Sequence, residues 1–195
     1  MGRPPRKKRA IERAALELFV EKGVDGTSIR DIALRAGVTE GALYRHHRSK
    51  NDLVTALFFE NYEGFAEVIR NILYEEQKFD PRIHLLVNSF FELYDQDPYI
   101  FHFIMIVHHR LLDDVRADEK NPVELLSRIL RKARDGGEIP PQNTDRTTQM
   151  LLGMMLQTAV GHHHGRIHST LVDHADYVAR ACILVAKNGE GNGTG

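Results

Sequence analysis

The chain has 195 residues, 42% of them hydrophobic and 27% charged, which is the composition of an ordinary globular protein. No apolar run reaches the roughly 18 residues of a membrane-spanning helix, and the single cysteine, Cys182, excludes an internal disulfide framework and fits the reducing cytoplasm in which we expect the protein. The net charge of −1 hides an asymmetry, because residues 1–52 hold 12 Lys and Arg against 7 Asp and Glu (+5), and the rest hold 14 against 20 (−6), a pattern typical of a chain whose N-terminal part meets a polyanion.

Three helices are predicted near the N-terminus. The first has apolar residues at the i, i+3, i+4, i+7 and i+8 positions of an amphipathic helix, and Gly23 ends it in a left-handed conformation. These apolar residues are Ile11, Ala14, Ala15, Leu18 and Phe19. Thr27 or Ser28 caps the second helix, residues 36–38 form a turn, and Thr39 caps the third helix.

Longer helices are predicted in the rest of the chain. Prolines stand at two of the predicted starts, where the first helical turn tolerates them. We expect one helix over residues 49–75, one that begins at Pro81 and one that begins at Pro98. Three more helices are expected over residues 122–136, 146–161 and 169–187, and a flexible tail follows the last of them. No stretch shows sustained period-2 alternation, so we expect an all-α fold of about nine helices.

Two short helices joined by a glycine-containing turn form a helix-turn-helix. Packing of the apolar residues Ile32, Ala33, Val38 and Leu43 onto the first helix leaves a polar surface outward on the third. The N-terminal end of that surface has small residues, so the backbone of the third helix can approach a DNA major groove closely. The N–H groups near Ser49 and Lys50, at the start of the fourth helix, are placed to hold a phosphate.

The segment "TSIRDIALRAGVTEGALYRHHRSKNDL", within residues 10–55, resembles the N-terminal DNA-binding domain of the TetR/AcrR family of bacterial transcriptional repressors. The agreement is continuous and has no gaps. The resemblance implies an all-helical homodimer whose N-terminal domain, residues 5–65, carries a helix-turn-helix at about 28–47. This domain is followed by an effector-binding and dimerisation domain over residues 66–188 and by a tail over residues 189–195.

The resemblance also implies which residues contact DNA. Residues at phosphates are Thr27, Tyr44, His46 and Lys50, and residues that face bases are Thr39, Glu40, Gly41 and Arg45; Ser28 completes the predicted interface. At position 47 the family usually has an aromatic residue that packs inward, and this chain has His47. We therefore expect His47 to be a hydrogen-bonded core residue, with a metal ligand and a pH switch as the alternatives.

Aromatic, methionine and polar residues in the body predict an apolar pocket with a few polar groups, although each of them alone is typical of an ordinary core. The predicted lining is Phe65, Phe90, Tyr94, Phe101, His102, Met105, His109, Met154 and Gln157. This mixture favours an apolar or amphipathic effector, whose identity the sequence does not name.

A cluster of histidines, His162, His163, His164 and His168, lies in "GHHHGRIH". The spacing of His164 and His168 suits metal chelation on one helix, but Gly165 argues against an unbroken helix there, so we expect no metal and no cofactor. No motif of an enzyme active site is present. The predicted function is a ligand-released repressor on a palindromic operator, with a metal-responsive regulator and a ligand-independent architectural DNA binder as alternatives.

Overall fold

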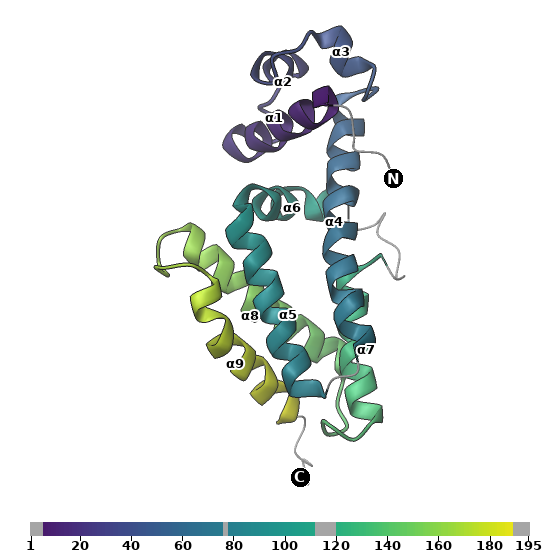
Figure 1. Cartoon of the computed structure of the whole chain (residues 1–195), viewed down its shortest axis with the longest axis vertical. Coiled ribbons are helices and arrows are strands. Elements are labelled where there is room, and N and C mark those ends of the chain that lie inside the picture. The colour runs from purple at the N-terminus through teal and green to yellow at the C-terminus, as the bar shows by residue number, and fades with distance from the viewer. Residues whose placement is uncertain (1–5, 76–77, 112–119, 189–195) are drawn as a thin grey trace. The chain divides into compact units, whose positions relative to one another are not determined.

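A computed structural model of the chain describes residues 6–75, 78–111 and 120–188 (Figure 1). Within these ranges the protein is all-helical and has no strand, which confirms the predicted fold class. The α-helices are α1 Arg6–Lys22, α2 Ile29–Arg35, α3 Glu40–Tyr44, α4 Lys50–Tyr74, α5 Phe79–Gln96, α6 Pro98–Leu111, α7 Pro122–Asp135, α8 Thr144–His163 and α9 Ala175–Lys187. The predicted flexible tail, residues 189–195, lies outside the described residues.

Helix boundaries follow the capping residues that the sequence indicated. Gly23 has φ +75° after α1, and Asn121 accepts hydrogen bonds from the first N–H groups of α7. The last helix is an exception, because α9 begins at Ala175 and not at residue 169 as predicted. Ser169 has φ +69°, a left-handed conformation that no helix contains, and a 3-10 turn, Val172–His174, precedes α9.

The start of this 3-10 turn is fixed from another helix. The N–H groups of Leu171 and Val172 donate to the two carboxylate oxygens of Asp95 on α5, at 3.1 and 3.0 Å. A carboxylate that receives two backbone N–H groups is a strong helix-start signal. Because Asp95 is 76 residues away from Leu171, a reading of local sequence could not locate this start.

The chain divides into two compact units. In its described part, the first unit comprises residues 6–62 and 98–111, so that α6 belongs to the N-terminal unit. The ring of Phe103 on α6 stacks on Phe19 of α1 with centroids 5.8 Å apart, and the guanidinium of Arg13 lies 5.0 Å from the ring centre of Tyr99. The predicted domain border after residue 65 included no part of α6, and it stays a prediction.

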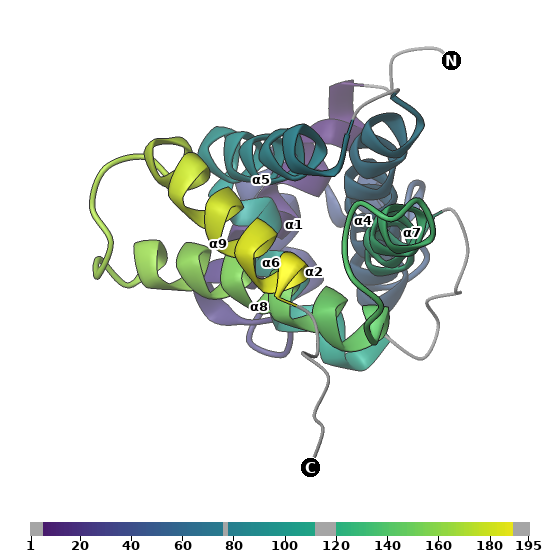
Figure 2. The same ribbon diagram turned by 90° about the horizontal axis from the view of Figure 1, so that it is seen from below.

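The second unit comprises residues 63–97 together with the described residues from 120 onward. Helix α9 packs against α5 and α8, and α8 also packs against α7, which both ribbon views display (Figure 2). The core of this second unit includes Phe79, Phe91 and Leu125, each at most 1% exposed. No helix in the described ranges is long and apolar enough to cross a membrane.

The C-terminal end of α4 is capped inside this unit by a buried arginine. Arg82 is 2% exposed, and its guanidinium donates to the carbonyl groups of Ile72 and Glu75, at 3.3 and 2.8 Å. The last carbonyls of a helix have no partner within the helix. Arg82 supplies partners for two carbonyls at this end, and its charge also suits the helix dipole there.

Candidate nucleic-acid interface

The first three helices enclose a small apolar core. Its α1 residues are at most 3% exposed: Ile11, Ala14, Ala15, Leu18 and Phe19. Ile32, Ala33 and Leu43 on α2 and α3 are buried to the same degree, as predicted from their spacing. Val38, which the sequence also assigned to the core, is only half-buried, because it lies in the turn between α2 and α3. This core determines which faces of α2 and α3 are directed outward.

The connection between α2 and α3 is a tight turn that depends on Gly37. This residue has φ +66°, a conformation that glycine adopts without strain. The N–H of Val38 then donates to the carbonyl of Ala33 at 3.0 Å, which closes the end of α2. Thr39 starts α3, because its hydroxyl oxygen accepts the N–H of Ala42 at 3.2 Å. The turn and the cap together give the predicted helix-turn-helix.

Helix α3 has a polar, exposed outer face. The residues predicted to lie on it are all exposed: Thr39, Glu40, Gly41, Tyr44, Arg45 and His46. Space is open at Gly41, where an added Cβ would meet only the hydroxyl oxygen of Thr39, at 4.0 Å. The backbone of α3 can therefore come close to a grooved partner, as major-groove reading by a helix requires.

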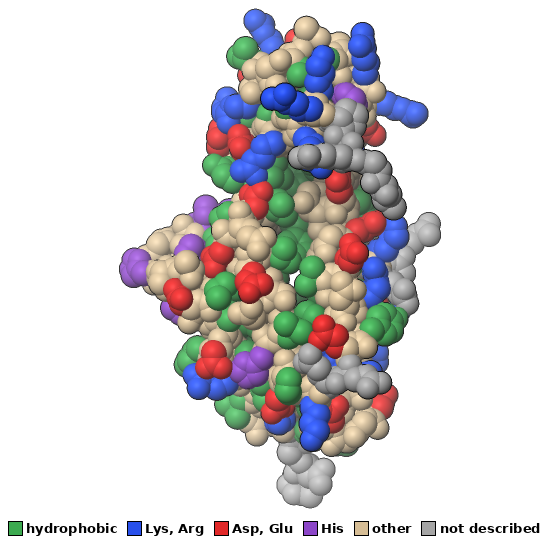
Figure 3. Space-filling view, viewed as in Figure 1, with side chains coloured by type: hydrophobic (Ala, Val, Ile, Leu, Met, Phe, Trp, Pro, Cys, Tyr) green, Lys and Arg blue, Asp and Glu red, His purple; other side chains and the backbone are tan. Residues whose placement is uncertain are grey.

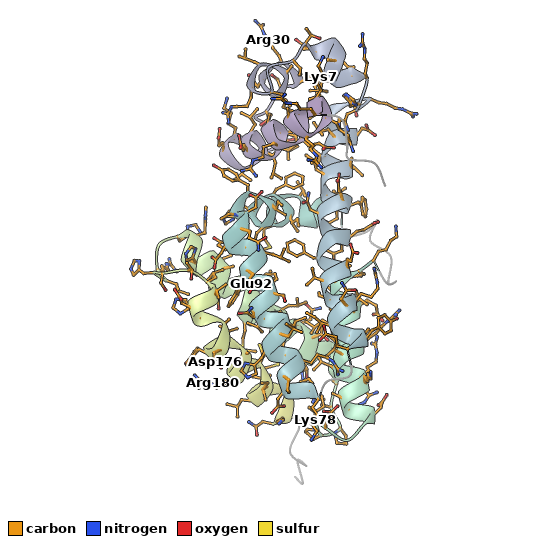
Figure 4. All side chains as sticks on the ribbon, viewed as in Figure 1. Lys7, Arg30, Lys78, Glu92, Asp176 and Arg180 are labelled. Carbon is orange, nitrogen blue, oxygen red and sulfur yellow. The ribbon has the colours of Figure 1, made fainter. Side chains whose placement is uncertain are left out.

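Exposed cations lie around this face. Lys and Arg side chains gather over the N-terminal helices in the space-filling view (Figure 3), and Arg30 projects from α2 (Figure 4). Arg30, Arg45 and Arg48 are exposed and form no ion pair with any part of the chain that the structure describes. Arg35, in contrast, lies 2.9 Å from a carboxylate oxygen of Glu21 on α1, and this hydrogen bond lowers the pKa of Glu21.

Arg30 and Arg48 were not among the predicted interface residues. The signal for Arg30 was its position two residues after the helix-capping Ser28, outside the apolar pair Ile32 and Ala33. Three exposed cations next to a polar helix face are suited to phosphate groups on either side of a groove.

Thr27 and Lys50, both predicted at phosphates, make hydrogen bonds inside the protein. The hydroxyl of Thr27 is 2.8 Å from the carbonyl oxygen of Gly23 and 3.1 Å from that of Leu18, and Thr27 is 1% exposed. The ammonium of Lys50 donates to the carbonyls of Val24 and Thr27, at 2.8 and 2.9 Å. The Thr27 side chain is buried, so its predicted phosphate contact, which stays a prediction, would require these internal bonds to be given up. For Lys50 it stays a prediction that competes with these two bonds.

Ser28 and Ser49 precede the first residues of α2 and α4. The N–H of Asp31 donates to the hydroxyl of Ser28 at 3.1 Å, and the N–H of Ser28 donates back to the Asp31 carboxylate at 3.0 Å. The Ser28 hydroxyl also donates to the Asp31 carboxylate at 2.7 Å, and this bond, together with that from the Ser28 N–H, lowers the pKa of Asp31. At α4 the N–H of Asp52 donates to the Ser49 hydroxyl at 3.0 Å, and the Asp52 carboxylate accepts the N–H of Arg48 at 2.9 Å. Ser28, a predicted DNA contact, is exposed, but its hydroxyl belongs to this cap.

The two adjacent histidines after α3 face opposite environments. His46 is exposed, whereas His47 is 3% exposed, as the sequence predicted for a core position. The expected hydrogen bond is absent at the Nε2 atom of His47, which is buried and has no partner among the described residues. Burial lowers the pKa of His47.

Some of the predicted pocket residues come together in the second unit. The rings of Phe65 on α4 and Phe90 on α5 are in contact, with centroids 6.3 Å apart, and both side chains are half-buried. Tyr94 is buried and packs edge-on against His162 of α8. Met154 is half-buried, but Gln157 is exposed and does not line the interior of this chain, because it lies on the outer side of α8.

The other predicted pocket residues belong to α6, in the first unit. Phe101 is buried, and His102 and Met105 are half-buried. The side chain of His109 lies outside the described part of the structure.

The C-terminal histidines stabilise a loop. The Nε2 atom of His162 is 2.8 Å from the carbonyl oxygen of Ser169, and that of His174 is 2.9 Å from the carbonyl oxygen of His168. Gly165 has φ +64° and follows the end of α8, so His164 and His168 do not share a helix. No group of three or more metal-ligating side chains occurs within the described residues.

Comparison with known proteins finds a family model that covers this interface. Residues 11–57 match the model of the bacterial regulatory proteins of the tetR family. The chain is 50% identical over 48 residues to the HTH-type transcriptional repressor Rv3405c of Mycobacterium tuberculosis. This alignment covers 25% of this chain and 26% of that protein. Across the mycobacterial regulators matched, the alignments span only 26% to 38% of the relative's length.

Other relatives match over most of their length. The fatty acid metabolism regulator protein of Bacillus subtilis is 26% identical over 154 residues, 74% of this chain and 77% of that protein. Among solved structures, the transcriptional regulator FadR of Bacillus subtilis in complex with stearoyl-CoA superimposes with a TM-score of 0.74 at 20% identity, covering 94% of this chain and all of that one. At this identity the structural likeness establishes a shared fold.

We predict that Lys50→Met destabilises the N-terminal unit. The substitution removes the donor for two carbonyl groups of the α1–α2 loop, so the free energy of unfolding should fall by about 1–3 kcal/mol in urea denaturation. The control is Lys7→Met, at an exposed position on α1 (Figure 4), which should change it by less than about 0.5 kcal/mol. Equal effects of both variants would contradict the anchoring role of Lys50.

Proposed function

Because this chain belongs to the TetR family of bacterial regulatory proteins, we propose that it is a DNA-binding transcriptional regulator. In this proposal it is a cytoplasmic homodimer that represses at a palindromic operator until a small apolar or amphipathic ligand releases it. The observation that carries the proposal is the exposed, polar face of α3, open at Gly41 and flanked by exposed arginines that form no ion pair with the described residues.

The proposed contacts divide between bases and backbone. Thr39, Glu40, Gly41 and Arg45 face base edges in the major groove, where arginine reads guanine with two hydrogen bonds. Tyr44 and His46 contact phosphates, and Arg30 and Arg48 add charge on the two sides of α3. The exposure of all these residues supports their contact with DNA. Thr27 is not part of it, since its side chain is buried.

The proposed dimer forms through the last two long helices. Large apolar side chains are exposed on α8 and α9: Met150 at 47%, Tyr177 at 73% and Leu184 at 62%. Gly153, three residues after Met150 on α8, is exposed as well and allows a close approach of helices. Apolar side chains that share helix faces on a soluble protein indicate an interface, and two such helices from each protomer would form a four-helix contact. A two-fold dimer also suits a palindromic operator.

The proposed ligand is amphipathic, and a long-chain acyl-CoA is the first compound to test. The aromatic pair Phe65 and Phe90, with Tyr94 and Met154 in the same unit, offers the apolar surface that an acyl chain needs. Relatives named for fatty acid metabolism and for a complex with stearoyl-CoA support this class. Release requires tighter ligand binding to the released state, and a preference of about 100-fold corresponds to about 2.7 kcal/mol of coupling.

The first test of the proposal separates base reading from phosphate contact. Arg45→Ala should relax base preference by roughly 1–3 kcal/mol at one position of each half-site, since a bidentate base contact is lost. Tyr44→Phe should weaken binding to all sequences alike. Selection of duplexes from a randomised library, followed by titration of selected and scrambled duplexes, measures both. A uniform loss in both variants would contradict the assignment of Arg45.

The dimer proposal predicts that Leu184→Asp dissociates the protein. A carboxylate placed in an apolar contact must be desolvated without a partner, so the dimer should be strongly weakened. Sedimentation at micromolar concentration measures the state of assembly. Leu34→Asp is the matched control, because Leu34 is 81% exposed on α2 in the N-terminal unit. A wild-type protein that sediments as a monomer would contradict the proposal.

For the ligand, stearoyl-CoA should release the protein from a selected duplex, whereas coenzyme A alone should not. Phe65→Ala should raise the concentration needed for release several-fold, because it removes the ring that contacts Phe90. The control is Tyr74→Ala, a 65% exposed aromatic residue of the same helix. Release by Zn²⁺ or Ni²⁺ alone, abolished by His163→Ala or His164→Ala, would overturn the apolar ligand.

A further inference from the structure

The imidazole of His47 occupies a site between two carboxylates that come from different helices. His47 lies between α3 and α4 and is 3% exposed. Its Nε2 atom is 3.8 Å from a carboxylate oxygen of Glu12 on α1, and its Nδ1 atom is 3.8 Å from a carboxylate oxygen of Asp52 on α4. Both distances exceed that of a hydrogen bond.

A neutral imidazole cannot suit both neighbours. It carries one N–H, so its other nitrogen directs a lone pair at a carboxylate. In this structure Nε2 is buried without a hydrogen-bond partner among the described residues. An imidazolium has two N–H groups and donates from both nitrogens, one toward Glu12 and one toward Asp52. The arrangement therefore matches the protonated ring better than the neutral one.

Other charges act on this site from each element around it. From α1, Lys8 lies 3.2 Å from the Glu12 carboxylate, and its positive charge opposes protonation of His47, as does that of His46 if protonated. From α4, the charges of Asp52 and Glu60 favour protonation.

Burial is the largest effect, and it lowers the pKa of His47 while it raises that of Glu12. In the free protein His47 is therefore neutral at pH 7.

His47 is joined to the recognition helix and to the start of α4 through the backbone. Its N–H donates to the carbonyl of Leu43 in α3 at 3.0 Å, and the Asp52 carboxylate accepts the N–H of Arg48 at 2.9 Å. Because Asp52 is hydrogen-bonded to the backbone of Arg48, a movement of its carboxylate toward the imidazole also moves the segment that follows α3. The neighbouring residues Tyr44, His46 and Arg48 are exposed, where DNA phosphates are proposed to bind.

We infer that His47 is a proton-linked positioning residue: when the protein binds DNA, the imidazole takes up a proton from solvent and closes onto Glu12 and Asp52. This inference rests on the proposed function. DNA phosphates bring negative charge to the surface above His47, and negative charge stabilises the imidazolium. The cation then links α1, the end of α3 and the start of α4 by two charge-assisted hydrogen bonds.

The direction of the pH effect follows from linkage. If DNA raises the pKa of His47 above its value in the free protein, the complex holds more protons than the separated partners, so affinity rises as the pH falls. The increase begins as the pH falls through the pKa in the complex and ends below the pKa in the free protein. Stability of the free protein changes in the opposite sense, because burial lowers the pKa of His47 below its unfolded value of 6.5.

The experiment measures affinity for one selected duplex by fluorescence anisotropy at pH 8, 7 and 6 and constant ionic strength. Wild-type affinity should rise several-fold over this range, since a pKa difference of about one unit between free and bound states corresponds to a rise of at most about tenfold. His47→Phe and His47→Gln should lose most of this increase, and Glu12→Gln should reduce it. Two His47 variants are used so that a packing defect in one does not decide the result.

The main control is His46→Gln, because His46 is the other imidazole of this segment and is exposed beside the proposed phosphates. This variant should bind more weakly and keep the pH dependence. Carbon-13 NMR of the histidine rings, with His84 of the second unit as reference, should detect a higher pKa for His47 in the complex than in the free protein.

The possible results are distinguishable. A pH dependence that His46→Gln abolishes and His47→Phe retains, or wild-type binding that does not change with pH, would overturn the role of His47 and leave the proposed function intact. Absence of selective duplex binding at every pH would overturn both.

Discussion

Two hydrogen bonds from the ammonium of Lys50 connect the end of the first helical segment to the start of the fourth. Their acceptors are the carbonyls of Val24 and Thr27, in the loop that leads into α2. The recognition helix α3 has only five residues, and a helix of that length is not stable by itself in water. Its position therefore depends on the elements on both sides of it, and Lys50 ties these elements together.

The N-terminal unit combines such internal bonds with a surface on which several arginines are exposed. Arg35 and Glu21 hold α2 to α1, and Thr27 uses its hydroxyl inside the loop. Arg30, Arg45 and Arg48 form no ion pair with the described residues. Arginines of this unit thus serve two purposes: Arg35, beside a carboxylate, joins two helices, whereas the other three leave their charge exposed at the surface. This distribution suits a protein that must keep its shape while it exchanges solvent ions for a polyanion.

Local signals explain most of what could be predicted from the sequence. The apolar spacing of α1, the glycine at position 37 and the cap of Thr39 act within a few residues, so the helix-turn-helix was predictable. Contacts between distant residues were not. The burial of Thr27, the bonds of Lys50 and the start of the 3-10 turn before α9, fixed by Asp95, all depend on partners that only the folded chain brings close.

The packing of α6 against α1 has a consequence for how the protein can be divided. Phe103 stacks on Phe19, and Tyr99 lies under Arg13, so residues 98–111 complete the core of the N-terminal unit. A fragment that ends after α4 would uncover the face of the Phe19 ring that stacks on Phe103. The DNA-reading part is therefore not a contiguous module, and a chimera that transfers it to another body needs a matching sixth helix as well.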